Sequence, residues 1–392
     1  MDMDDGQPSQ MDADDISNQA PIPPLPADAA RERCPQHAEP APPPHPPVYQ
    51  QPSEQQEIIH DLEVDTRNSD NDSSLGSDVD SITTSLRSAD YEFRFEHGRR
   101  YQSANGMYHL PNDVQEMDRL ELQHLIWMEM LGGRYNLAPL ESSRLTHALD
   151  VGCGTGNWAI EFANLHPDVQ VLGTDLSPIQ PDWVPANCSF FIDDCTHDWS
   201  FHQRFDYVHC RALTMGIADW DRLVDQAHAF LQPGGWLELQ EFHLPLDSPD
   251  GSVAPGSALW TWGRKISEVC ARLGIDSLAA LRHGERLRRR GFQEVGERYL
   301  PTPLGPWAKG QRQKRIGWMG RKDLYEGIDG ISKKLFLMMG EASEEVDDLL
   351  ERCKAELLDS SIHVCMPLHV IWGQKPFTDT AQQTAGDADM MQ

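Results

Sequence analysis

The 392-residue sequence lacks several features that would assign it to common classes of protein. No apolar run approaches the ~18 residues that a membrane span needs, and no charged-then-apolar signal peptide opens the chain. We therefore expect no membrane contact and a location in the cytoplasm or the nucleus. Basic residues are scarce as well, because 33 Lys and Arg stand against 62 Asp and Glu, for a formal net charge of -29. That balance argues against direct binding of nucleic acid through its phosphate backbone.

The eight cysteines are scattered and form no C-x-x-C pair. Cys195 and His197 lie close together, but they lack a second pair of ligands at the spacing of a zinc site. The sequence therefore predicts free thiols in a reducing compartment and no bound metal.

The acidic excess is concentrated in residues 1–90, which contain 19 acidic and four basic residues. Pro, Ser, Gln, Asp and Asn dominate this segment, as in "EPAPPPHPPVYQQP" and "DTRNSDNDSSLGSDVDS". Such a composition cannot bury enough apolar surface to offset the entropy lost on ordering the chain. We expect a disordered acidic, Pro- and Ser-rich tail over 1–90, one domain over 91–376 and a second disordered tail over 377–392.

Within the expected domain, short β-rich runs alternate with segments whose apolar residues recur at helical spacing. This βαβ alternation predicts a parallel sheet with helices on both faces. Two later runs would add a hairpin at the sheet edge, and longer helices accompany them. The expected strands are 147–151, 169–175, 189–193, 206–210, 236–242, 292–300 and 362–374, and the expected helices are 118–131, 157–166, 219–231, 259–274 and 343–358.

Three glycines, Gly152, Gly154 and Gly156, follow the first strand in "ALDVGCGTGNW". Glycine tolerates positive φ and lets a ligand approach the backbone closely. The dinucleotide fingerprint G-x-G-x-x-G is not met, because Asn157 stands where its third glycine would be. The Walker pattern is not met either, since no Gly-Lys-Ser/Thr follows. The loop predicts some other ligand at the carboxyl edge of the sheet, and a glycine-rich turn without a ligand is the alternative.

Acidic residues end the next two strands, where ligands of open α/β sheets bind. Asp175 is placed to accept both hydroxyls of a ribose, although it could instead cap the following turn near Ser177. Asp193 and Asp194 end the third strand, where a carboxylate could accept the exocyclic amine of adenine. The pattern therefore predicts a nucleoside with a small polar appendage, and S-adenosyl-L-methionine fits that description.

The stretches "LDVGCGTG", "GTDLSP" and "LQPGGWLEL" resemble those of the class I S-adenosylmethionine-dependent methyltransferases. The resemblance implies an α/β fold with a Rossmann-like sheet of seven strands, mostly parallel with an antiparallel last strand. It also implies helices on both faces and helical cap insertions. In the cofactor site, it implies that Asp150 anchors the loop and reaches the methionyl ammonium through water, and that Leu176 binds the cofactor beside Asp175.

A closer resemblance covers residues 96–376. The stretches "FEHGRRY", "LSPIQPDWVPANCSF" and "PGGWLELQEF" are similar to those of the fungal LaeA-like methyltransferases, which include velvet-complex regulators and enzymes of secondary-metabolite gene clusters. One implied function is methylation of a small-molecule intermediate of fungal secondary metabolism. The alternative is a LaeA-like nuclear regulator of secondary metabolism and development, in a velvet-type complex whose protein partners bind the acidic tail. A cofactor-binding pseudoenzyme is a third reading.

No catalytic residue can be assigned from the sequence, because a sulfonium methyl is already activated and methyl transfer mainly needs alignment. His209 and His243 near the carboxyl edge are candidates for a base, with structural or substrate-contact roles as the expected alternative. Tyr101, in "EHGRRY", is predicted to reach the methionyl carboxylate from a flap, unless this stretch is a plain polar loop. The basic stretch 306–322 is predicted to lie in a cap above the acceptor, with a solvated helix face as the alternative.

Overall fold

The computed structural model describes residues 93–102 and 108–377, all within one compact unit, Thr83–Gln392. The expected tail over 1–90 lies outside the described residues. The same holds for the expected tail over 377–392, apart from its first residue.

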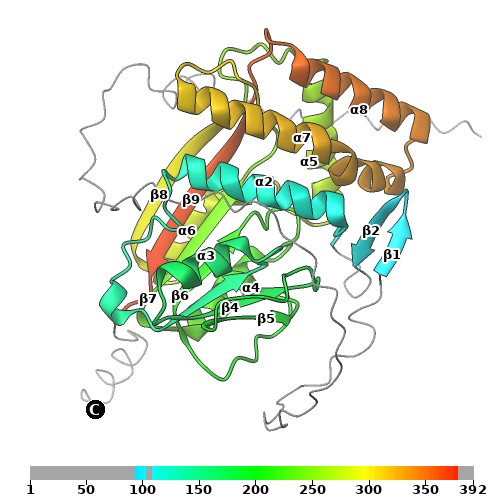
Figure 1. Ribbon diagram of the computed structural model, residues 1–392. Helices are drawn as coiled ribbons and strands as arrows, with labels where there is room; N and C mark the ends of the chain where they lie inside the picture. The colour runs from blue at the N-terminus through cyan, green and yellow to red at the C-terminus, as the bar shows by residue number, and fades with distance from the viewer. Residues whose placement is uncertain (1–92, 103–107, 378–392) are drawn as a thin grey trace, which may run out of the picture. The chain divides into compact units, whose positions relative to one another are not determined.

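A seven-stranded sheet forms the centre of the described unit, with the strand order β5-β4-β3-β6-β7-β9-β8 (Figure 1). Strands β3 to β7 pair in parallel, whereas β9 runs antiparallel to both β7 and β8. This confirms the predicted sheet with its antiparallel last strand. The strands are β3 (His147–Val151), β4 (Gln170–Asp175), β5 (Cys188–Ile192), β6 (Phe205–Arg211), β7 (Leu231–Phe242), β8 (Gln293–Pro303) and β9 (Cys365–Gln374).

Helices cover both faces of the sheet because successive strand residues point to opposite sides. Ala148 packs with α3 (Asn157–Leu165), whereas its neighbour Leu149 packs in the cluster that contains α4 (Trp220–Phe230). The helix α6 (His283–Arg289) joins the α4 face through Leu287. On the other side, α2 (Val114–Met130) packs against Leu368 and Val370 of β9. The central strands are therefore buried on both faces.

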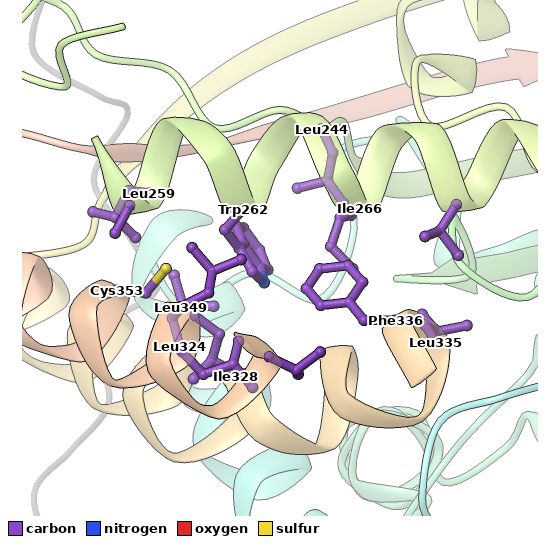
Figure 2. Packing of buried hydrophobic residues seen from close by; sticks show 14 of the residues in the cluster. Leu244, Leu259, Trp262, Ile266, Leu324, Ile328, Leu335, Phe336, Leu349 and Cys353 are labelled. Atoms are coloured by element: carbon purple, nitrogen blue, oxygen red, sulfur yellow. The ribbon is translucent and has the colours of Figure 1, made fainter. Parts of the chain in front are cut away.

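Three longer helices form the predicted cap: α5 (Ala258–Arg272), α7 (Gln311–Met338) and α8 (Ser343–Leu358). Figure 2 shows Trp262 and Ile266 of α5 facing Phe336 of α7, all in one apolar cluster. The basic stretch 306–322 contributes the first part of α7, which lies alongside α2 (Figure 1). The cap thus rests on the helix that covers β9.

The stretch "EHGRRY" forms a separate two-stranded hairpin of β1 (Phe93–Glu96) and β2 (Arg99–Gln102). Its two turn residues, His97 and Gly98, both have positive φ, at 51° and 78°. Two-residue hairpin turns of this kind match the twist of the flanking strands. Two short 3₁₀ turns, η2 (Ser142–Arg144) and η3 (Ala279–Arg282), complete the described elements.

The cap core should be sensitive to cavity formation. We expect Phe336→Ala, which empties a fully buried site, to lower the free energy of unfolding by about 3–5 kcal/mol. Trp318→Ala on the same helix should cost less than about 1 kcal/mol, because that side chain is 52% exposed. Urea unfolding of both variants checks this, and equal losses would show that α7 does not pack as described.

Candidate functional site

A cavity opens at the carboxyl ends of β3, β4, β5 and β6, beneath α2 and the cap. Seven of the residues predicted to bind the cofactor line it: Asp150, Gly152, Gly154, Asp175, Leu176, Asp193 and Asp194. Four other candidates, Gly156, Tyr101, His209 and His243, are not among its lining residues. The structure therefore brings most of the predicted set to one edge of the sheet.

The glycine loop needs its glycines for two physical reasons. Gly152, Gly154 and Gly156 all have positive φ, at 65°, 56° and 81°. A Cβ on Gly156 would also lie 2.5 Å from the Phe190 ring, so this glycine supports the loop from behind although it does not line the cavity. The loop presents backbone to the cavity where side chains would fill it.

The carboxylate of Asp175 joins the glycine loop to the turn after β4. Its Oδ2 accepts a hydrogen bond from the Gly154 N–H at 2.8 Å, and its Oδ1 accepts one from the Ser177 N–H at 2.9 Å. An ionised carboxylate offers about four lone-pair sites, so both oxygens can still accept a ribose hydroxyl. The hydrogen bond from Ser177 is the turn cap that we gave as the alternative role of Asp175. The Asp175 side chain makes this contact and also lines the cavity. Burial raises the pKa of Asp175 to about 6.

The two acidic residues after β5, Asp193 and Asp194, make different contacts. Asp194 Oδ1 accepts hydrogen bonds from the backbone N–H and the hydroxyl of Thr196, which shapes the loop. Asp193 is held near Asp175 by its N–H, which donates to the Asp175 carbonyl at 3.0 Å. Burial raises the pKa of the Asp193 carboxyl. Both residues line the cavity on the side of Asp175.

His209 supports Asp150 rather than facing the cavity. The two residues are neighbours across β3 and β6, and His209 Nδ1 lies 2.7 Å from Asp150 Oδ1. The imidazole is fully buried and stacks on the Trp158 indole at 3.9 Å between ring centroids. This environment favours the structural role that we gave as the alternative for His209.

His243 and Tyr101 lie away from the glycine loop. His243 is buried beside His369, with its Nδ1 3.0 Å from His369 Nε2. Tyr101 is buried in the β1–β2 hairpin, with Lys334 Nζ 4.0 Å from its ring centroid. Among the described residues no contact joins Tyr101 to the glycine loop, and its role as a flap residue stays a prediction.

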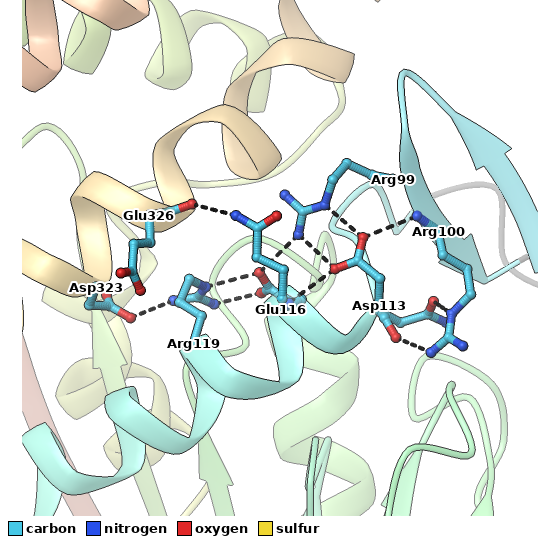
Figure 3. Close-up of polar contacts among 9 residues, drawn as sticks. Arg99, Arg100, Asp113, Glu116, Arg119, Asp323 and Glu326 are labelled. Carbon is cyan, nitrogen blue, oxygen red and sulfur yellow. Dashed lines mark hydrogen bonds and ion pairs between the residues drawn. The ribbon is translucent and has the colours of Figure 1, made fainter.

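An ion-pair network connects α2 with the cap, and it was missed at the sequence level (Figure 3). Arg119 pairs with Glu116 through both of its oxygens, at 2.7 and 3.0 Å, and with Asp323 of α7 at 2.9 Å. All three residues line the cavity. The start of α2 could be predicted from the sequence, because Asp113 is a good N-cap residue and Glu116 follows three residues later.

The same end of α2 holds the hairpin. Arg99 Nε donates to Asp113 Oδ2 at 2.6 Å, and Arg100 bonds to both the carbonyl and the side chain of Asn112 (Figure 3). The hairpin, α2 and α7 are therefore connected by charged hydrogen bonds, which are stronger than neutral ones.

A second missed group lies at the end of β6. Arg211 lines the cavity, and its Nη2 lies 2.9 Å from His124 Nδ1 of α2. His124 Nε2 in turn lies 2.8 Å from Glu161 Oε2 of α3. Arg211 could have been found from the sequence, because it is a charged residue at the end of an apolar strand, at the carboxyl edge of the sheet.

Beyond the glycine loop and these charged groups, most of the cavity lining is apolar. Side chains from α2, α5, α7, β7 and β9 line it beyond the glycine loop. They are Ile126, Trp127, Trp262, Leu324, Ile331, Phe242, Met366 and Leu368. One continuous cavity thus combines a polar end at the sheet edge with an apolar compartment under the cap.

Comparisons with known proteins identify related methyltransferases. Residues 132–293 match the methyltransferase domain family. The methyltransferase pytC of Aspergillus terreus is 37% identical over 303 residues, which cover 76% of this chain and 93% of pytC. The secondary metabolism regulator laeA of Emericella nidulans is 30% identical over 296 residues, which cover 73% of this chain and 77% of laeA. Among solved structures, phosphoethanolamine N-methyltransferase 2 of Haemonchus contortus has 17% identity and a TM-score of 0.42, covering 71% of this chain and 62% of that one.

The fold and the site define an S-adenosylmethionine-dependent methyltransferase. The chain belongs to the fungal methyltransferase family that includes pytC and laeA, as the resemblance to LaeA-like proteins indicated.

The residues present fit the cofactor of this class. The glycines have positive φ, a Cβ on Gly152 or Gly156 would collide with Leu213 or Phe190, and Asp175 lines the cavity with acceptor sites beyond its two backbone hydrogen bonds. In the described part of the chain, no helix is long and apolar enough to cross a membrane. Over the same residues, His, Cys, Asp and Glu side chains nowhere gather in threes as metal ligands would.

Asp175 should dominate cofactor affinity. Each charge-assisted hydrogen bond to a ribose hydroxyl contributes about 1.5–3 kcal/mol, so Asp175→Ala should weaken S-adenosylmethionine binding by roughly 10²-fold or more. Asp175→Asn should weaken it less, because one amide oxygen can still accept. The exposed Asp182→Ala serves as the control and should bind like the wild type. In calorimetric titrations, equal dissociation constants for all four proteins would leave Asp175 with the turn-capping role alone.

Proposed function

We propose that this methyltransferase acts on a small, largely apolar intermediate of fungal secondary metabolism. The observation that supports this most is the continuity of the cavity, in which the apolar compartment under α5 and α7 directly adjoins the glycine loop. An acceptor in that compartment would lie beside the end of the cofactor site. The apolar lining would favour a hydrocarbon or aromatic framework over a charged one.

The bound cofactor would supply a methyl group already activated on a sulfonium. The work left to the chain is to align the acceptor and exclude water. Trp127, Trp262 and Phe242 provide apolar walls that exclude water. We propose neither His209 nor His243 as a base, because His209 is stacked behind the sheet edge and His243 pairs with His369. The catalytic residues therefore remain unassigned.

A second candidate function is a nuclear regulator that methylates protein. The observation in its favour is the 30% identity with laeA, a relative described both as a protein-methionine methyltransferase and as a secondary metabolism regulator. The acidic segment 1–90 would then bind regulatory partners. Either function suits the cytoplasm or the nucleus, and all seven cysteines in the described residues are free, as a reducing compartment requires.

Transfer of labelled methyl groups separates the two functions. The purified protein would be incubated with methyl-labelled S-adenosylmethionine and a fungal extract, which is then divided into small molecules and protein. We expect label in the small-molecule fraction, and none above background with Asp175→Ala. Label that enters protein alone would contradict the proposal and favour the regulator.

A further inference from the structure

Arg211 is a half-buried cation that has no ion-pair partner among the residues that the structure describes. It ends β6, and its side chain lines the cavity. No carboxylate oxygen lies within ion-pair distance of it among the residues that the structure describes, and its Nη1 is shielded from solvent and has no hydrogen-bond partner. A donor of a charged group that is shielded from solvent and unpaired costs free energy, which an anion bound in the cavity would offset.

The hydrogen bonds around His124 show that this residue does not neutralise the guanidinium. An arginine is always protonated and can only donate, so His124 Nδ1 must accept from Arg211 Nη2. The remaining proton then lies on Nε2, which donates to Glu161 Oε2. His124 is therefore neutral, and burial together with the nearby Arg211 lowers its pKa. Its role is to orient Arg211, with Glu161 fixing the tautomer.

Other charged groups near Arg211 are already engaged. Asp150 lies on the same cavity wall, but its Oδ1 is bonded to His209 and neither of its oxygens lies within ion-pair distance of Arg211. Glu161 acts through His124 and is partly exposed. Arg119 in the same cavity has two carboxylate partners, Glu116 and Asp323. The contrast between the two arginines of one cavity singles out Arg211 as the group that lacks an anion.

The strand order places Arg211 at one end of the cofactor site. Cys210 pairs with Val151, so Arg211 lies beside Gly152 at the start of the glycine loop. The acids after β5 and β4 lie on the far side of β3, and the four strands β5-β4-β3-β6 span about 14 Å at the usual spacing. A cofactor with adenine near β5 and ribose near β4 would have its methionyl group next to β6.

We propose that Arg211 binds the carboxylate of the cofactor's methionyl group, with His124 holding the guanidinium in position. This inference rests on the placement of the cofactor in this cavity and deepens it. It assigns to Arg211 the contact that the sequence suggested for Tyr101. A carboxylate on the acceptor would have the same chemistry, but the position beside Gly152 favours the methionyl group.

Two ligands that differ by the amino-acid group test the proposal. S-adenosylhomocysteine carries the carboxylate, whereas 5′-methylthioadenosine has the same nucleoside thioether without it. By calorimetry, Arg211→Gln should weaken binding of S-adenosylhomocysteine by about 10- to 100-fold. Its affinity for 5′-methylthioadenosine should stay within about twofold of the wild type. Arg211→Lys keeps the charge and should lose less, with the same selectivity for the carboxylate ligand.

Arg286→Gln provides a matched control. Like Arg211, Arg286 bonds to a histidine Nδ1, that of His283, but it is buried, pairs with Asp221 and does not line the cavity. The Arg286→Gln substitution should leave the ratio of the affinities for S-adenosylhomocysteine and 5′-methylthioadenosine unchanged. An unchanged affinity of Arg211→Gln for S-adenosylhomocysteine, or equal losses for both ligands, would overturn the proposal. If the wild type bound neither ligand, the placement of the cofactor itself would be wrong.

Discussion

The hydrogen bonds of one carboxylate, Asp175, hold the polar end of the site together. They connect the glycine loop after β3 with the turn after β4, two segments that approach only because their strands are neighbours in the sheet. The positive-φ glycines give the loop its path, and Asp175 fixes that path against β4. Because the same carboxylate lines the cavity and has more acceptor sites than its two backbone hydrogen bonds use, one side chain both shapes the site and is available to a nucleoside.

The other half of the cavity depends on α2. This helix packs on β9 through Trp127, is joined to α7 by the ion pair of Arg119 with Asp323, and orients Arg211 through His124. A small shift of α2 would therefore move the apolar compartment and the proposed carboxylate contact together. The buried ion pairs favour one arrangement of the cap over others, because breaking them would leave charges without partners.

The alternation of strands and helices, the glycine loop and the acids at the strand ends were predictable, because they follow from local patterns and from the rule that ligands bind at the carboxyl edge. The Arg119–Asp323 pair was not predictable, since its residues are 204 positions apart and meet only through the packing of α7 on α2. His209 was predictable as an edge residue, but strand pairing turns it toward Asp150 and Trp158. For Tyr101, a two-residue turn folds the expected flap into a hairpin.

The pH dependence of cofactor binding tests the central role of Asp175 most directly. Burial raises the pKa of this carboxyl to about 6 in the ligand-free protein, and binding requires the ionised form. The affinity for S-adenosylhomocysteine should therefore be constant above about pH 7 and fall as the pH decreases through 6, approaching tenfold per unit below it. Asp175→Asn should remove this fall, whereas Asp193→Asn should retain it. A wild-type affinity that does not change between pH 7.5 and 5, or the same fall in Asp175→Asn, would contradict the account.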